Sequence, residues 1–219
     1  MSSEGRTRIK FCGFTRAEHA LAAAALGVDA IGLVLVPGSK RQLSLDAAAA
    51  IRRVLPPFVA AVALLQDAPA AAVQEAIDAL RPDLLQFHGA EPPEFCASFG
   101  LPYLKAVAMR GKPDLKRLAR SYREAGALLL DGHAPGSLGG QGQSFDWTQV
   151  RAVGKPLILA GGLYVDNVAA AIAAVHPYAV DVSSGIESAP GIKDSGKMSA
   201  FVSAVRRADA ASVSNSNDA

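Results

Sequence analysis

Short runs of hydrophobic residues alternate along this chain with longer segments in which hydrophobic positions recur at helical spacing. Several of the short runs are apolar at nearly every position, which is typical of parallel strands that are covered on both faces. The pattern predicts eight strands, at Arg8–Cys12, Ala30–Val34, Val59–Leu64, Leu84–Phe87, Tyr103–Ala106, Ala127–Leu130, Pro156–Leu159 and Ala179–Val182.

Helical spacing fills the segments between these strands. It predicts helices at Arg16–Leu26, Leu45–Leu55, Ala68–Leu80, Glu91–Phe99, Asp114–Arg123, Val165–Val175 and Ser195–Arg207, and a short, weak one at Phe145–Val153. Thr15 is followed three positions later by Glu18, a spacing that predicts a capping box at the first helix.

Strict alternation of strands and helices implies a parallel sheet. Eight repeats within about 200 residues favour a closed (β/α)8 barrel, the TIM barrel, over an open doubly wound sheet. We therefore predict one α/β domain, the barrel, over residues 8–208. Residues 1–7 are expected to form an N-terminal extension, and the small, polar residues 209–219 a disordered tail.

Composition narrows the function classes. The chain has 219 residues, of which 50% are hydrophobic and 19% charged, and its net charge of +2 comes from Lys and Arg residues spread along the sequence, so no nucleic-acid surface is expected. No segment resembles a secretory signal or a membrane span. The two cysteines form neither a disulfide framework nor a zinc motif, which favours a cytoplasmic protein without a metal. No apolar stripe is evident, which favours a monomer.

In such barrels the active site lies at the carboxyl ends of the strands. Gly161 and Gly162 follow the seventh predicted strand, and Ser183, Ser184 and Gly185 follow the eighth. Glycine lets backbone N–H groups approach an anion closely, and the seventh and eighth loops commonly bind phosphate in this fold. Two tight turns are the simpler alternative, but both loops together favour a phosphate site.

Two residues at strand ends could exchange protons with a substrate. Cys12 ends the first strand, either as a small buried side chain or as a thiolate that acts as base or nucleophile. Asp131 follows the sixth strand, either as a turn residue or as a general acid or base tuned by partial burial. Lys10 is expected to face away from Cys12, so it is not assigned to activate the thiol.

Three other features could contact a substrate. His88 ends the fourth strand beside Gln86, and could cap a loop or contact the ligand. Arg41 follows the second strand, where it is either solvated or paired with a substrate carboxylate. The glycine-rich segment 132–144 has the length and composition of a mobile lid, or of a simple insertion.

Seven motifs carry a resemblance to a known family. They are KFCGFT at Lys10–Thr15, SKR at Ser39–Arg41, LQFHG at Leu85–Gly89, LLLD at Leu128–Asp131, GGQGQSFDW at Gly139–Trp147, LAGGL at Leu159–Leu163, and DVSSGIE followed by GIKD at Asp181–Asp194. In this order, over about Lys10 to Val205, they resemble the phosphoribosylanthranilate isomerase family of tryptophan biosynthesis. The usual KICG, SPR and GGTG of the family are KFCG, SKR and GGQG here, and the lost proline could loosen the Arg41 loop.

The resemblance implies specific roles. It implies that Cys12 is the catalytic base and that Asp131 is the general acid. It also implies that Arg41 binds the anthranilate carboxylate. It places the phosphate at Gly161, Gly162, Ser183, Ser184 and Gly185, with His88 and Asp181 near the substrate. The implied reaction is an Amadori rearrangement by acid–base catalysis, with no cofactor and no metal.

Two alternatives stay open at this stage. One is the histidine-pathway isomerase that performs the same rearrangement on a bisphosphorylated substrate. Members of that family resemble two half-barrels and use aspartates as acid and base, whereas Cys12 ends the first strand here. The other is a non-catalytic barrel that binds a phosphorylated metabolite.

Overall fold

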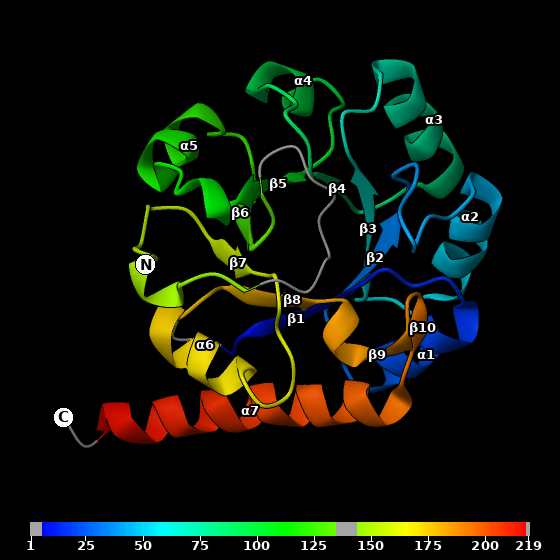
Figure 1. Ribbon diagram of the computed structural model, residues 1–219. Helices are drawn as coiled ribbons and strands as arrows, with labels where there is room; N and C mark the ends of the chain where they lie inside the picture. The colour runs from blue at the N-terminus through cyan, green and yellow to red at the C-terminus, as the bar shows by residue number, and fades with distance from the viewer. Residues whose placement is uncertain (1–5, 135–143, 218–219) are drawn as a thin grey trace.

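The computed structural model describes residues 6–134 and 144–217, and side chains as far as residue 211. Eight parallel strands close into one barrel in the order β1 to β8 (Figure 1), which confirms the predicted (β/α)8 fold. The strands are β1 (Arg8–Cys12), β2 (Ala30–Val34), β3 (Ala60–Leu65), β4 (Leu84–Phe87), β5 (Tyr103–Ala108), β6 (Ala127–Asp131), β7 (Leu157–Leu159) and β8 (Ala179–Val182).

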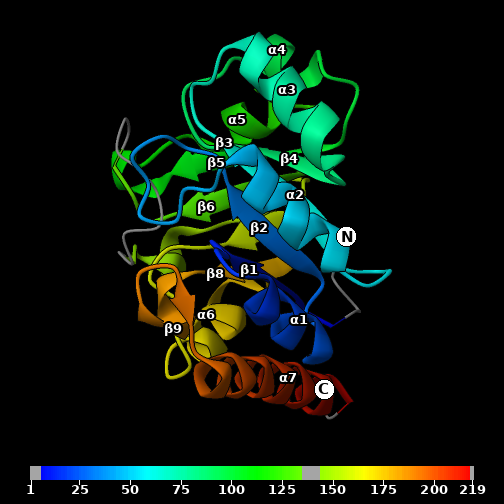
Figure 2. The same ribbon diagram turned by 90° about the vertical axis from the view of Figure 1, so that its right-hand side faces the viewer.

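Helices surround the strands, as the side view in Figure 2 shows. They are α1 (Ala17–Ala25), α2 (Leu45–Val54), α3 (Ala70–Leu80), α4 (Pro93–Ala97), α5 (Leu115–Ser121), α6 (Val168–Val175) and α7 (Ser195–Asn217). Short 3₁₀ turns complete the set: η1 (Met109–Gly111), η2 (Trp147–Gln149) in the segment predicted as a weak helix, and η3 (Ser184–Ile186). A small antiparallel pair, β9 (Glu187–Ala189) and β10 (Ile192–Lys193), was not expected from the sequence.

Side chains along each strand point alternately into two packing layers. Ile9 and Phe11 of β1 lie in the large apolar layer between strands and helices, where the ring of Phe11 meets Phe201 of α7 edge to face at 5.9 Å. The inner layer holds small and branched residues of several strands: Val62, Leu104, Ala106, Ala127, Leu129, Ile158, Ala160 and Ala179. Inward-facing side chains at the carboxyl ends of the strands therefore project into the barrel mouth.

Two local expectations, at the starts of α1 and α4, differ from the structure. The Thr15 hydroxyl donates to the carbonyl of Gly191 at 2.6 Å, and α1 begins after Arg16 with no side-chain cap, so the capping box is wrong. Helix α4 is shorter than predicted because the Glu91 side chain binds groups outside the helix. Its carboxylate accepts the N–H groups of Asp67 and Gly89 and pairs with buried Lys105 at 2.8 Å.

The expected boundary at residue 208 falls inside α7, which continues to Asn217, so the segment predicted to be a disordered tail is largely helical. Alanines at positions 208, 210 and 211 favour this continuation. The carboxylate of Asp209 also accepts the backbone N–H of Thr7 at 2.9 Å and its hydroxyl at 2.6 Å. Residues assigned to both terminal extensions thus help to fasten α7 to the start of β1.

Candidate active site

A pocket opens at the carboxyl ends of the strands, where the fold predicts an active site. Its wall has an apolar part on β2 and β3 and a polar part on the other strands and loops. It is lined by Cys12, Val34, Val36, Ser39, Arg41, Leu64, Gln66, Gln86, His88, Asp131, Ala160, Gly161, Gly162, Leu163, Asp181, Val182, Ser183 and Ser184.

Nine of the ten site residues predicted from the sequence line this pocket: Cys12, Arg41, His88, Asp131, Gly161, Gly162, Asp181, Ser183 and Ser184. Gly185 lies behind the lining, where a Cβ atom would overlap the carbonyl oxygen of Leu163. It lets the loops after β7 and β8 approach each other. The proposed lid, residues 132–144, lies mostly outside the described residues.

Cys12 lies inside the barrel mouth with Lys10, and the expectation that these two face apart is wrong. They are two positions apart on β1, so both side chains project to the same face of the strand. The Lys10 ammonium pairs with Asp181 of β8 at 3.0 Å, and both groups are buried. Gly32 of β2 leaves the necessary room, because a Cβ atom there would lie 2.5 Å from the Cys12 sulfur.

Burial governs the protonation of Cys12. It raises the pKa of the thiol above its ordinary value, and Asp181 acts in the same direction. The positive charges of Lys10 and Lys193 lower the pKa, but they do not offset burial. The neutral thiol is therefore favoured over the thiolate in the free protein.

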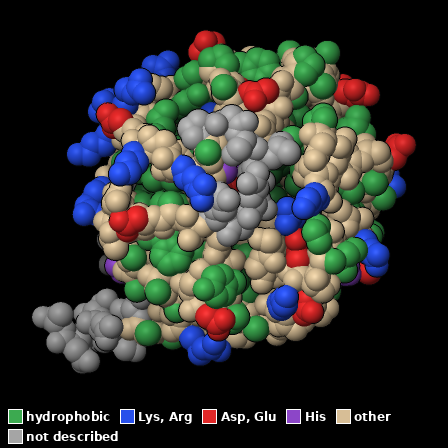
Figure 3. All heavy atoms as spheres, in the orientation of Figure 1, with side chains coloured by type: hydrophobic (Ala, Val, Ile, Leu, Met, Phe, Trp, Pro, Cys, Tyr) green, Lys and Arg blue, Asp and Glu red, His purple; other side chains and the backbone are tan. Residues whose placement is uncertain are grey.

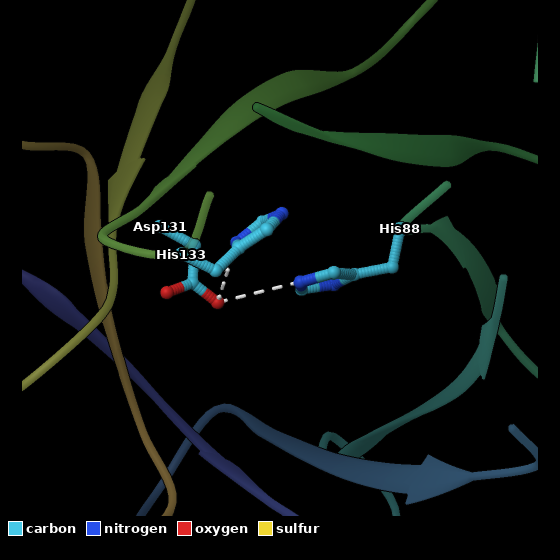
Figure 4. Close-up of side chains that lie close together, drawn as sticks. All are labelled: His88, Asp131 and His133. Atoms are coloured by element: carbon cyan, nitrogen blue, oxygen red, sulfur yellow. Dashed lines mark ion pairs between the residues drawn. The ribbon is translucent and has the colours of Figure 1, made fainter. Parts of the chain in front are cut away.

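The Asp131 carboxylate lies beside two neighbouring imidazoles (Figure 4). Its Oδ2 is 3.3 Å from Nε2 of His88 and 3.5 Å from Nδ1 of His133. Burial alone raises the pKa of this carboxyl, but the neighbouring imidazoles of His133 and His88 outweigh burial and hold the pKa below its usual range. The carboxylate form of Asp131 is thus favoured in the free protein, and its contact with His133 was not predicted from the sequence.

The two phosphate-type loops have the predicted glycine geometry. Gly161 and Gly162 have φ values of +76° and +67°, in the left-handed region that favours glycine. The amide of Asn167 fixes this turn, donating to the Gly162 carbonyl at 2.8 Å and accepting the Tyr164 N–H at 2.8 Å. Helix α6 begins only at Val168, so its N-terminus does not follow the glycines directly as we had expected.

Arg41 reaches the pocket through a buried network that sequence reasoning missed. Its guanidinium forms two hydrogen bonds of 2.7 Å with the carboxylate of Glu187, on β9. Lys193 of β10 contacts the same carboxylate at 2.8 Å and donates to the carbonyls of Cys12 at 2.6 Å and Ser183 at 3.1 Å. Both residues lie in the quoted motifs DVSSGIE and GIKD, but only the unpredicted hairpin brings them together.

A family model decides the identity of this barrel. The model for N-(5'-phosphoribosyl)anthranilate (PRA) isomerase matches residues 9–204. The chain belongs to this family. The resemblance inferred from seven motifs is therefore confirmed.

Relatives and solved structures agree with the PRA isomerase assignment. The N-(5'-phosphoribosyl)anthranilate isomerases of Acidithiobacillus ferrooxidans and Pseudomonas paraeruginosa are 51% and 52% identical, over 91% of this chain in each case and over 97% and 95% of those proteins. The crystal structure of the Thermus thermophilus enzyme has a TM-score of 0.84 at 38% identity, covering 92% of this chain and 99% of that one.

A second structure is a phosphoribosyl anthranilate isomerase in complex with reduced 1-(o-carboxyphenylamino)-1-deoxyribulose 5-phosphate. Its TM-score is 0.78 at 34% identity, covering 92% of this chain and 99% of that one. The family and the fold of the chain are thus supported by sequence and by structure independently.

Charge on the molecular surface adds little to the PRA isomerase assignment. On the face drawn in Figure 3, Lys and Arg side chains gather mainly over α5, whose sequence is LKRLARS, and elsewhere they mix with Asp and Glu. Within the described part of the chain, no helix combines the length and the hydropathy needed to cross a bilayer.

Proposed function

We propose that this chain converts N-(5'-phosphoribosyl)anthranilate to 1-(2-carboxyphenylamino)-1-deoxyribulose 5-phosphate, the reaction for which its family is named. One observation carries the proposal: Cys12, Asp131, Arg41 and the Gly161–Gly162 turn all line the same pocket. A substrate that carries both a carboxylate and a phosphate fits this set of groups.

The two ends of the substrate have distinct partners in the proposal. Gly161, Gly162, Ser183 and Ser184 surround the phosphate with backbone N–H and hydroxyl donors, and Gly185 keeps the two loops close enough to share it. At the other end, Arg41 holds the anthranilate carboxylate.

The aromatic ring of the substrate needs an apolar surface next to Arg41. Val34, Val36 and Leu64 form such a surface, in contact with Cys12. A ring packed there would place the ribose between the thiol and the polar wall of the pocket.

The chemistry is two proton transfers. Asp131 donates a proton to the ribose ring oxygen as the C1–O bond breaks, which leaves an open-chain iminium ion. The Cys12 thiolate removes the proton from C2, the C–H electron pair forms the C1–C2 double bond, and the enolamine tautomerises to the ketone. The iminium nitrogen accepts the electron pair, so this route uses no cofactor and no metal.

The proposed chemistry needs a proton on Asp131 and none on Cys12, whereas the free site favours the reverse. Cys12 is favoured as the neutral thiol and Asp131 as the carboxylate. The number of protons is the same in both arrangements. A proton must therefore leave Cys12, and one must reach Asp131, when the substrate binds.

A fluorescence assay tests the proposed activity. Anthranilate phosphoribosyltransferase generates the fluorescent substrate in situ, and the purified chain is then added. We expect the fluorescence to disappear faster than it does by spontaneous decay. An unchanged decay rate would support the binding-only barrel instead, and turnover of the bisphosphorylated histidine-pathway substrate alone would support the other isomerase.

We also propose a cytoplasmic monomer. Both cysteines are free and buried, which suits a reducing compartment. The exposed large hydrophobic side chains of the described residues, Leu21, Phe58, Tyr164 and Tyr178, belong to different segments of the chain. Light scattering of the purified protein gives the oligomeric state, and a mass of twice the chain mass would overturn the monomer.

A further inference from the structure

The imidazoles and the carboxylate in Figure 4 converge from two segments of the chain, the ends of β4 and β6. His88 follows β4, Asp131 ends β6, and His133 follows two residues later. Their ligand-type atoms all lie within 4.8 Å of one another, and each of the three residues is at most 7% exposed. We propose that these three side chains form a binding site for a zinc-class divalent ion, and that the ion inhibits the isomerase.

The spacing of the ligand atoms suits such an ion. Zinc binds imidazole nitrogen and carboxylate oxygen at about 2.0–2.2 Å, so tetrahedral geometry keeps two ligand atoms about 3.3 Å apart. The Asp131 oxygen lies 3.3 Å from the His88 nitrogen and 3.5 Å from the His133 nitrogen. One ligand atom from each of the three residues lies within 4.8 Å of the other two. Rotation of the imidazole side chains would bring all three atoms to the tetrahedral spacing.

In the free protein the two nitrogens lie at ion-pair distance from the Asp131 carboxylate, at 3.3 and 3.5 Å. Within the described residues, neither Nε2 of His88 nor Nδ1 of His133 has a hydrogen-bond partner, although both atoms are buried. A buried polar atom without a partner costs about 1–3 kcal/mol, so its presence in a native site needs an explanation. A bound cation supplies the missing partner for both.

Gln86 can prepare His88 as a ligand. Its side-chain amide is 3.1 Å from Nδ1 of His88, and its Oε1 is buried without a partner. Turning the amide by 180° directs Oε1 at Nδ1, where it accepts a hydrogen bond from the Nδ1–H group. The lone pair of Nε2 then points toward Asp131, in the arrangement by which proteins commonly orient a metal-bound histidine.

The ion would stop catalysis by a simple exclusion. A carboxylate that coordinates a cation cannot hold the proton that Asp131 must donate. This consequence depends on the proposed function, whereas the binding site does not. The preferred ions are those that favour imidazole, such as Zn²⁺ and Co²⁺, and Mg²⁺ is a weak competitor because it favours oxygen ligands.

Binding is tested first on the free protein, without substrate. Titration calorimetry with Zn²⁺ and visible absorption with Co²⁺ should both give one site per chain. His133→Asn should weaken binding by more than about 100-fold, since losing even an outer partner of a ligand costs about 10–100-fold. Gln86→Leu should weaken zinc binding by about 10–100-fold, because Gln86 is an outer partner of His88. His176→Asn is the matched control, because His176 is an exposed imidazole in a left-handed backbone position that asparagine tolerates.

Inhibition is tested separately. Zn²⁺ should abolish turnover of the wild-type enzyme reversibly on chelation, and at least 100-fold more zinc should be needed for His133→Asn. Zinc affinity that is unchanged in His133→Asn but lost in Cys12→Ser would place the ion on the thiol and overturn the proposal. Thermal unfolding of each variant checks that it is folded. A protein that binds zinc at this site but has no isomerase activity would refute the proposed function and leave the site intact.

Discussion

Glu187→Gln is the substitution whose effect the structure defines most closely. Glu187 is 8% exposed, and its carboxylate holds partly buried Arg41 by two hydrogen bonds of 2.7 Å and buried Lys193 by one of 2.8 Å. Glutamine has the same shape but no charge, and its amide nitrogen is a donor that must face at least one of these donors. The variant therefore leaves buried positive charge without its counter-ion.

Removing one partner of a buried ion pair typically costs about 3–5 kcal/mol of unfolding free energy. In a domain of this size, 1 kcal/mol corresponds to a change in Tm of about 2–4 °C. We therefore expect the Tm of Glu187→Gln to fall by roughly 6–20 °C at pH 7. Glu75→Gln, on the exposed face of α3, is the control and should change stability by less than about 0.5 kcal/mol.

The pH dependence of this difference gives a second check. Burial raises the pKa of Glu187, but Arg41 and Lys193 outweigh burial, and the pKa of the folded protein is lowered. A carboxyl with a lowered folded pKa contributes stability above its unfolded pKa of about 4.3, and loses it as the pH falls through the folded value. The stability gap between wild type and Glu187→Gln should thus narrow below about pH 4. An equal Tm at pH 7, or a gap that stays constant down to pH 3, would refute the reasoning.

Three further predictions concern the pocket. Cys12→Ser and Asp131→Asn should each lower kcat by about 10²–10⁴-fold or more while the substrate still binds, and near-normal turnover in steady-state assays would remove the assigned role. Arg41→Ala should raise KM, by about 2–5 kcal/mol of binding energy if the carboxylate pair is desolvated, whereas Arg53→Ala on exposed α2 should not. The rate of Cys12 alkylation by iodoacetamide should still be rising above pH 9, because burial raises the thiol pKa, and a plateau by pH 8 would contradict this. Cys96 should not interfere, since it is 0% exposed and burial raises its pKa to about 12.

The barrel could be predicted because its signal is local. Strands such as Ala30–Val34 and Leu84–Phe87 are short, apolar and bounded by helical segments, and the structure has them at the predicted residues. The strand-end rule then placed Cys12, His88 and Asp131 around one pocket. Only backbone periodicity and chain order are needed for these steps, and both are properties of the sequence itself.

Contacts between buried charges could not be predicted in the same way. The partners of Glu187 and Lys193 depend on a two-stranded hairpin with no strong hydrophobic pattern, and the wrong orientation of Lys10 hid the Lys10–Asp181 pair. The pKa of Asp131 depends on His133, in a loop whose path no local pattern sets.

These buried charges connect the two ends of the site to its chemistry. Lys193 donates to the carbonyl of Cys12 and to that of Ser183, and it shares Glu187 with Arg41. One ammonium therefore links the base, the loop proposed to bind phosphate and the arginine proposed to bind the carboxylate. Because Lys193 contacts backbone atoms at two of these points, its removal should displace both loops together. The position of Cys12 relative to the proposed phosphate loop is thus a property of the Lys193 network as well as of the barrel.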